Sequence, residues 1–269
     1  MPVWFWVAAV FVVLLLLLVA AAALLAVVYQ DNIVYAAHVD EQVVLPEDLG
    51  YVEHESYENV VLTTRDGEKL HGVFFWAAAA SPPEEASGSR ISWDDSTPTV
   101  LWLHENAGSI ASRLPQVSDV VRLVGCNVFI FDYRGYGASS GTPSEQGLKI
   151  DAEDALLWLT QRPDIDKSRV VVFGRSLGGA VAVHLATEPT TRDLFAALLL
   201  ENTFASLPEL AVALFSPLRL LLPFLHNQWD SVDAVRKHGL HVPTLFFAAL
   251  RDRTVPHAQM LKLYLAARS

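Results

Sequence analysis

The sequence is poor in cysteine, in charged residues and in basic residues. Of its 269 residues one is cysteine (Cys126), 18% are charged, and 19 Lys and Arg stand against 30 Asp and Glu. A single cysteine excludes a scaffold of internal disulfide bonds. The net charge of −11 excludes a basic nucleic-acid-binding surface as the main theme, so no nucleic-acid partner is expected. No cluster of potential ligands has metal-site spacing and no P-loop lysine is present, so neither a metal nor a cofactor is expected.

Residues 1–30 contain no charged side chain. Residues 3–28 are an unbroken run of Val, Trp, Phe, Leu and Ala, which as a helix would be about 39 Å long and exceed the roughly 30 Å bilayer core. The run is too long for the apolar part of a cleaved signal peptide, and no basic residue precedes it. We therefore predict a retained single-pass anchor at 1–30, with bilayer lipid as a partner, in the plasma membrane or an endomembrane. Arg65 is the first basic residue, so charge does not orient the anchor.

Beyond an acidic segment at 31–57, which we interpret as a stalk, one domain is expected over 58–269. Its first feature is a hairpin around the turn at 65–68, and 81–98 is expected to be a surface loop. Short apolar runs then alternate with helical stretches, which is typical of a parallel sheet covered on both faces. The predicted fold class is therefore α/β. The expected strands are 99–103, 127–131, 169–173, 195–200 and 243–249, and the expected helices are 111–123, 144–161, 177–187, 207–222 and 256–267.

The pentapeptide at 174–178 fits the G-x-S-x-G pattern of a nucleophile elbow. It lies between a predicted strand and a glycine-rich helix, which is the context that this pattern requires. Ser176 would occupy a strained turn, in which a side chain at 174 or 178 would collide with neighbouring backbone. The N–H groups that begin the helix would face an oxyanion formed there. We therefore predict Ser176 as a nucleophile and the backbone N–H of Leu177 as an oxyanion-hole donor.

Two further loops follow predicted strands at the carboxyl edge of the sheet, where open α/β sheets place their chemistry. In the first loop, the backbone N–H of Asn106 is the expected second oxyanion donor, and His104 would hold the loop in place. A plain turn with a buried histidine is the alternative. In the second loop, Asp252 is expected to be the carboxylate of a Ser–Asp–His triad. Glu201, at the end of the preceding predicted strand, is a less favoured substitute. The alternative for Asp252 is a carboxylate paired with a neighbouring arginine.

Together these motifs resemble those of the membrane-anchored α/β-hydrolase domain-containing serine hydrolases. The matching stretches are 131–137 with Ser139, 143–145, 147–148, 174–180 and 201–204, and the apolar N-terminus is shared. The resemblance extends from about residue 58 to the end of the sequence. It implies an α/β-hydrolase fold with a mostly parallel sheet and helices on both faces, and a catalytic Ser, acid and His. Glu105 departs from the glycine that this family usually has there.

The histidine of the triad is missing from its usual place. Only His257 follows Asp252, five residues on and at the start of a predicted helix, whereas in this fold the histidine comes after a further strand. The sequence therefore predicts a domain at 58–269 that is truncated at its C-terminus. His257 could be the base only if the local backbone departs from that of the family. Without a placed base Ser176 is a weak nucleophile, so little ester hydrolysis is expected.

Three functions remain open at this point. The first is a membrane-anchored serine hydrolase that cleaves an ester, thioester or amide of a small acyl or lipid-like substrate. The second is a serine peptidase on the same fold. The third is a catalytically silent scaffold that binds a lipid or a protein. The apolar stretch at 207–225 is compatible with a cap over an acyl chain and equally with a buried helix.

Overall fold

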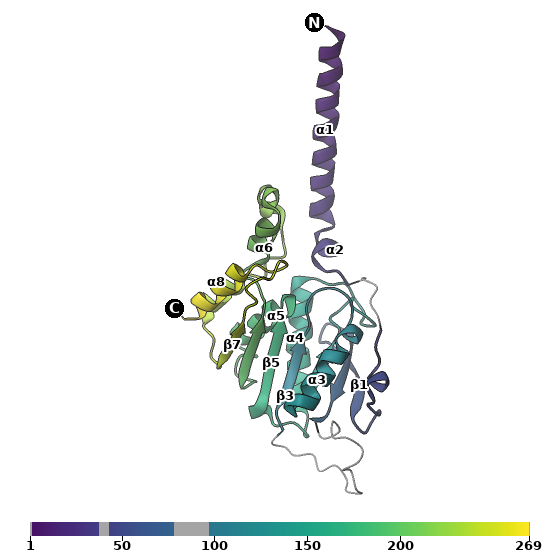
Figure 1. The fold of residues 1–269 in the computed structure, drawn as a ribbon, viewed down its shortest axis with the longest axis vertical. Coiled ribbons are helices and arrows are strands. Elements are labelled where there is room, and N and C mark those ends of the chain that lie inside the picture. The colour runs from purple at the N-terminus through teal and green to yellow at the C-terminus, as the bar shows by residue number, and fades with distance from the viewer. Residues whose placement is uncertain (1, 38–42, 78–96, 269) are drawn as a thin grey trace.

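The computed structural model describes residues 2–37, 43–77 and 97–268, and Figure 1 shows a twisted sheet with helices packed against it below one long helix. The loop expected at 81–98 lies outside the described residues apart from its last two. The described sheet has seven strands in the order β1-β2-β4-β3-β5-β6-β7. The predicted α/β class is therefore confirmed.

The sheet begins with the expected hairpin and continues as a parallel sheet. β1 and β2 are antiparallel, β2 is antiparallel to β4, and the strands from β4 to β7 are mutually parallel. This confirms the prediction of a mostly parallel sheet. The strands are β1 (Tyr57–Thr63), β2 (Lys69–Phe75), β3 (Thr99–Leu103), β4 (Asn127–Phe131), β5 (Val170–Arg175), β6 (Ala197–Glu201) and β7 (Thr244–Phe247).

Successive residues of the central strands enter hydrophobic clusters on opposite faces of the sheet. In β3, Leu101 and Leu103 belong to the cluster that includes helices α4 (Glu145–Gln161) and α5 (Leu177–Thr187). Trp102 belongs to the other cluster, which includes side chains of α3 (Leu114–Val124). A strand that is buried on both faces needs apolar residues at every position, which explains the unbroken apolar runs of the sequence.

Two helices differ from expectation. The helix expected over 207–222 is wrong beyond α6 (Leu207–Leu214), because Pro217 lacks the backbone N–H that a continuous helix needs. Two 3-10 turns, Ser216–Leu220 and Leu222–Phe224, follow instead. A further helix, α7 (Ser231–His238), was not predicted, although Asp230 caps it by accepting from the N–H of Asp233. The last helix is α8 (His257–Ala267).

The N-terminal helix α1 (Val3–Val28) stands clear of the domain (Figure 1) and is long and apolar enough to cross a membrane. It continues into α2 (Gln30–Val34), which begins the segment interpreted as a stalk. This segment contacts the domain, because Tyr35 is buried and its hydroxyl donates to Oδ1 of Asn227 at 2.7 Å. The same hydroxyl accepts from Nε1 of Trp229 at 3.0 Å. The base of α1 is therefore fixed to the domain.

Candidate active site

Ser176 occupies the turn between β5 and α5 in a backbone conformation that is unusual for a residue with a side chain. Its φ is 53° and its ψ is −115°. The turn is tied to the end of β6, because the N–H of Ser176 donates to the carbonyl of Glu201 at 3.0 Å. Oγ1 of Thr203 donates to the carbonyl of Ser176 at 2.7 Å. These bonds hold the serine at the carboxyl edge of the sheet, where it is half-buried.

The glycines around Ser176 allow strands and helix to approach closely. A Cβ on Gly174 would lie 2.3 Å from the carbonyl oxygen of Gly178, and one on Gly178 would lie 2.0 Å from that of Leu103. The expected collision at both positions is therefore confirmed. A Cβ on Gly179 would likewise lie 2.4 Å from Thr203. The N-terminus of α5 thus contacts β3 directly, and the N–H of its first residue, like others in a first helical turn, has no intrahelical acceptor.

His104 is a neutral packing residue in the loop after β3. Its side chain is fully buried, and this burial lowers the pKa of the imidazole to about 3. The ring lies 4.3 Å from that of Tyr133 and 5.5 Å from that of Tyr136, measured between centroids. Glu105, where the family pattern has glycine, places Oε1 3.5 Å from a guanidinium nitrogen of Arg113. The residue that replaces the family's usual glycine therefore forms an ion pair.

The side chain of Asn106 ties this loop to the segment after α1, which sequence reasoning missed. Its Nδ2 donates to the carbonyl of Val34 at 2.6 Å, and its Oδ1 accepts from the N–H of Ala36 at 3.0 Å. The same oxygen accepts from the hydroxyl of Tyr136 at 2.7 Å. These partners lie 30 to 72 residues away in sequence, so no local pattern reveals them. The loop is fixed between the sheet and the base of the anchor.

Asp252 lies beyond β7, at the same carboxyl edge as Ser176. Their strands, β7 and β5, are parallel and separated only by β6, so the strand axes lie roughly 10 Å apart. Oδ1 of Asp252 accepts from the N–H groups of Thr254 and Val255 at 2.7 and 3.0 Å. Within the described ranges Asp252 forms no ion pair with a neighbouring arginine. Glu201, the substitute acid, ends β6 and lies 3.8 Å from Nε of Arg175.

No histidine among the described residues forms a hydrogen bond or an ion pair with Ser176 or Asp252. His257 is exposed at the first position of α8. In the described part of the chain no hydrogen bond joins Oγ of Ser176 to a histidine, and none joins His257 to Asp252. The same residues contain no group of three His, Cys, Asp or Glu side chains that could hold a metal ion.

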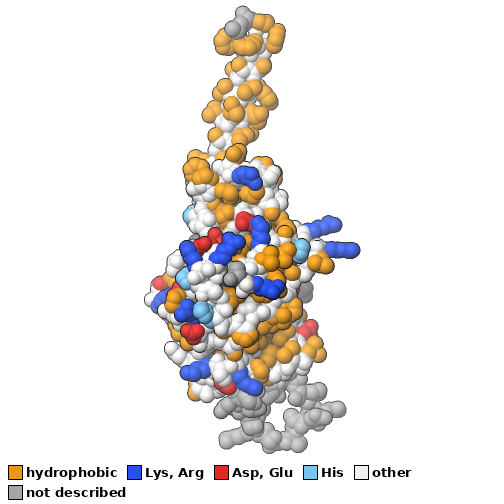
Figure 2. Space-filling model, turned by 90° about the vertical axis from the view of Figure 1, so that its left-hand side faces the viewer, with side chains coloured by type: hydrophobic (Ala, Val, Ile, Leu, Met, Phe, Trp, Pro, Cys, Tyr) orange, Lys and Arg blue, Asp and Glu red, His pale blue; other side chains and the backbone are white. Residues whose placement is uncertain are grey.

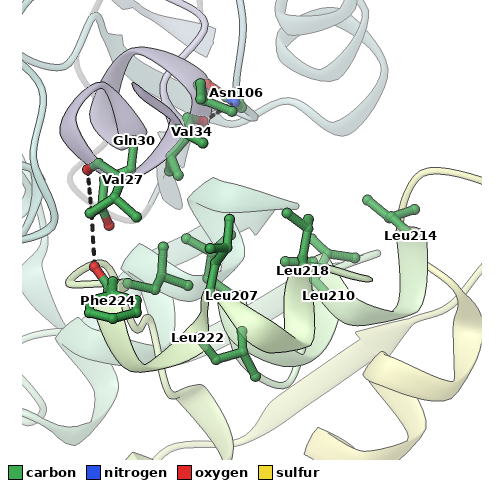
Figure 3. A pocket seen from close by; sticks show the side chains of 15 residues that line it. Val27, Gln30, Val34, Asn106, Leu207, Leu210, Leu214, Leu218, Leu222 and Phe224 are labelled. Atoms are coloured by element: carbon green, nitrogen blue, oxygen red, sulfur yellow. Dashed lines mark hydrogen bonds between the residues drawn. The ribbon is translucent and has the colours of Figure 1, made fainter. Parts of the chain in front are cut away.

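A pocket of about 340 Å³ lies beside Asn106, between the base of α1 and the segment 207–225. Figure 3 shows leucines of α6 and of the turns that follow it on one side, and Val27, Gln30 and Val34 on the other. We call the segment 207–225 the cap. Sequence reasoning left its role open because an apolar segment packs equally well in a core or over a cavity.

Comparisons with known proteins agree on the architecture. A family model described as "Alpha/beta hydrolase family" matches residues 70–268. The chain is 40% identical over 223 residues to "Alpha/beta hydrolase domain-containing protein WAV2" of Arabidopsis thaliana, which covers 78% of this chain and 67% of that protein. It is 36% identical over 242 residues to "Protein bem46" of Schizosaccharomyces pombe, with 88% and 74% covered. An "Uncharacterized membrane protein" of Saccharomyces cerevisiae is 35% identical over 243 residues, with 88% and 76% covered.

Solved structures share the fold at low sequence identity. An esterase of Pyrococcus furiosus superposes with a TM-score of 0.63 at 20% identity, over 87% of this chain and 84% of that one. An alpha-beta hydrolase from Vibrio vulnificus superposes with a TM-score of 0.68 at 19% identity, over 89% and 80%. At such identities the likeness concerns the fold alone.

Proposed function

The chain belongs to the alpha/beta hydrolase family, and on that basis we propose that it is a membrane-anchored serine hydrolase that cleaves an acyl ester, thioester or amide. The observation that carries this proposal is the backbone of Ser176, with φ 53° between a parallel strand and a helix N-terminus. A positive φ at a residue with a side chain costs about 1–3 kcal/mol and persists only where the surroundings impose it. Here the close contacts at Gly174 and Gly178 impose it.

In the proposed reaction, Oγ of Ser176 attacks the carbonyl carbon of the substrate. The backbone N–H groups of Leu177 and Asn106 stabilise the oxyanion, and the alcohol, thiol or amine leaves with the proton that the Ser176 hydroxyl gave up. Water then hydrolyses the acyl-serine, which releases the acid and restores the hydroxyl. Asp252 has the role of the carboxylate that orients a base.

Membrane anchoring is supported by α1, whose 26 residues have a mean hydropathy of 3.3 in their most apolar window. The yeast relative is called a membrane protein. We propose that α1 crosses the bilayer once and holds the domain against the membrane. Small acyl or lipid-like substrates fit this position best.

A catalytically silent scaffold is the second candidate. It is favoured by the lack of a hydrogen bond, within the described residues, between a histidine and Oγ of Ser176. Loss of one triad member costs on the order of 10⁴-fold or more in turnover number. Without a histidine hydrogen-bonded to Ser176, even an active hydrolase should therefore turn over slowly. Whether turnover depends on Ser176 therefore separates the two candidates better than the absolute rate of turnover does.

The test is hydrolysis of p-nitrophenyl acetate by the full chain in detergent, with Ser176→Ala and Ser168→Ala as a matched pair. Ser168 is exposed and precedes β5 at the opposite end of that strand. We expect slow hydrolysis that is lost in Ser176→Ala and kept in Ser168→Ala. Equal rates in the two variants would contradict the hydrolase. A parallel assay with a peptide p-nitroanilide separates esterase from peptidase activity, and an equal loss in His257→Gln would identify His257 as the base.

A further inference from the structure

The pocket beside the anchor is almost entirely apolar. Val27 of the last turn of α1 lines its wall, together with Ile33 and Val34 of α2, and Asn106 lies beside Val34 (Figure 3). Its volume of about 340 Å³ falls in the range of small-molecule sites. Among the described residues, Gln30 and Asn106 are its only polar lining side chains, and both already have hydrogen-bond partners. A ligand that fills this pocket must therefore be apolar over most of its length.

The cap forms the opposite wall with one face of α6. Leu207, Leu210, Ala211 and Leu214 line the pocket, and their spacing of three and four residues places them on the same side of the helix. None of the residues of α6 is fully buried. An apolar helix face over a cavity of this size lacks the packing partner that such a face has in a protein core.

Several apolar side chains of the cap are also largely exposed. Leu214, Phe215, Leu220 and Phe224 are between 54% and 81% exposed. Figure 1 shows the cap projecting from the domain on the same side as α1, and Figure 2 shows hydrophobic side chains continuing from α1 onto the adjoining part of the domain. An exposed apolar patch beside a membrane span is suited to the bilayer interface.

Hydrogen bonds fix the cap to the base of the anchor. Nε2 of Gln30 donates to the carbonyl of Phe224 at 3.1 Å, and Oε1 of Gln30 accepts from the N–H of His226 at 2.8 Å. Nδ2 of Asn227 donates to a carboxylate oxygen of Asp31 at 2.5 Å. The pocket therefore begins where the membrane span ends, between two elements that are held together.

The pocket is lined in part by the loop after β3, which adjoins the Ser176 turn. Gly178, two residues after Ser176, is packed so closely that a Cβ there would lie 2.0 Å from the carbonyl oxygen of Leu103 and 2.6 Å from that of His104. Asn106 follows His104 by two residues and lines the pocket. An elongated apolar ligand in the pocket would thus extend from the end of the membrane span to the loop that contains Asn106, the proposed second oxyanion donor.

We propose that this pocket binds the long acyl chain of a membrane lipid, which enters from the bilayer beside α1. The direction of its carbonyl group toward Ser176 rests on the proposed function, whereas binding of the chain itself does not. Because the acyl chain passes from one apolar environment to another, the shape of the pocket and its position at the membrane select the ligand. A hydrophilic ligand would lose its hydration without finding free hydrogen-bonding groups.

The test is photocrosslinking of the full chain in phosphatidylcholine vesicles that contain a phosphatidylcholine with a diazirine at the end of one acyl chain. Ala211→Trp places an indole inside the pocket, and Ala213→Trp places the same side chain on an exposed position of the same helix. Because α1 contacts lipid in any case, only adducts on residues 30–34, 106 and 207–211 are counted. We expect Ala211→Trp to lower these adducts about tenfold, which corresponds to roughly 1.4 kcal/mol, and Ala213→Trp to leave them unchanged.

Equal labelling of the two tryptophan variants, or adducts confined to α1, would overturn the proposal. A free diazirine fatty acid in a second arm distinguishes a lipid-borne chain from a free acid. Circular dichroism of both variants confirms that the comparison concerns folded protein. If p-nitrophenyl acetate hydrolysis depends on Ser176 while labelling does not respond to Ala211→Trp, the hydrolase stands and the acyl site falls. If labelling responds and no hydrolysis depends on Ser176, the acyl site stands without the hydrolase.

Discussion

Arg134 connects two carboxylates from distant parts of the domain, and its loss should be costly. Its backbone N–H and Nε donate to Asp151 at 2.8 and 2.9 Å, and a guanidinium nitrogen lies 2.7 Å from the same carboxylate. Its other guanidinium contacts are to Asp66 in the hairpin turn, at 2.8 and 3.0 Å. Asp151 is fully buried, and Arg134 is only 7% exposed. Arg134→Met would leave a buried carboxylate with one backbone donor.

The magnitude follows from this burial. Removal of one partner from a buried ion pair costs about 3–5 kcal/mol of unfolding free energy. The side chain of Asp66 is 36% exposed, so its lost contacts add at most about 1 kcal/mol. Because domains are stable by only about 5–15 kcal/mol, Arg134→Met should be severely destabilised. The double variant Arg134→Met with Asp151→Leu removes both charges and should recover most of the loss.

The unfolding free energy that Arg134→Met loses should depend on pH. Burial outweighs the hydrogen bonds of Arg134 and raises the pKa of Asp151 to about 6. A carboxyl group whose pKa is raised on folding stabilises the folded state fully when the pH is below its ordinary pKa near 4. This contribution is lost as pH rises through 6. Without Arg134 the pKa of Asp151 should rise further, so the deficit should be larger at pH 8 than at pH 5. The hydrogen bonds from Arg134 lower the pKa of Asp66 to about 2, so its contribution is lost only as pH falls toward 2.

The assay is urea unfolding of the full chain in detergent micelles, followed by tryptophan fluorescence at pH 5 and pH 8. Arg236→Met, which changes an exposed arginine of α7, is the matched control and should behave like the wild type. An unfolding free energy for Arg134→Met within about 1 kcal/mol of the wild type at pH 8, or a larger deficit at pH 5, would refute the reasoning.

Three further outcomes are expected. Gly178→Ala should lower the free energy of unfolding by about 1–3 kcal/mol in the same urea assay, because its methyl group would collide with the carbonyl of Leu103. Tyr35→Phe should cost about 1–3 kcal/mol, since it leaves Nε1 of the buried Trp229 without its acceptor; an unchanged value would show that this segment is not docked. Alkaline carbonate extraction should leave the full chain in the membrane pellet, and its release would contradict a retained span at 3–28.

The sheet was predictable because its signal is local. A strand buried on both faces must be apolar throughout, and the runs at 99–103 and 127–131 coincide with β3 and β4 to the residue. The glycine positions around Ser176 were predictable for a similar reason, because a sharp strand-to-helix turn excludes side chains at fixed positions. The contact between Gly174 and Gly178 is local, so a short pattern can predict it.

Features that depend on distant contacts were not predictable. A single helix was expected over 207–222 because the apolar composition of this stretch conceals the break at Pro217. The bonds of Asn106 to Val34 and Ala36 join segments about 70 residues apart, and neither segment carries a pattern for the other. The pocket between the anchor and the cap arises from the same long-range docking. It is therefore a property of the fold rather than of any motif.

The most direct measurement is mass-spectrometric mapping of the full chain in detergent after prolonged exposure to a fluorophosphonate. A strained, half-buried nucleophile should react selectively with the reagent, even if slowly where no base is hydrogen-bonded to it. We predict a single adduct on Ser176, absent from Ser176→Ala and retained in Ser168→Ala. Adducts spread over other serines, or no adduct on Ser176 after exposure that modifies a denatured control, would contradict a reactive serine at this turn.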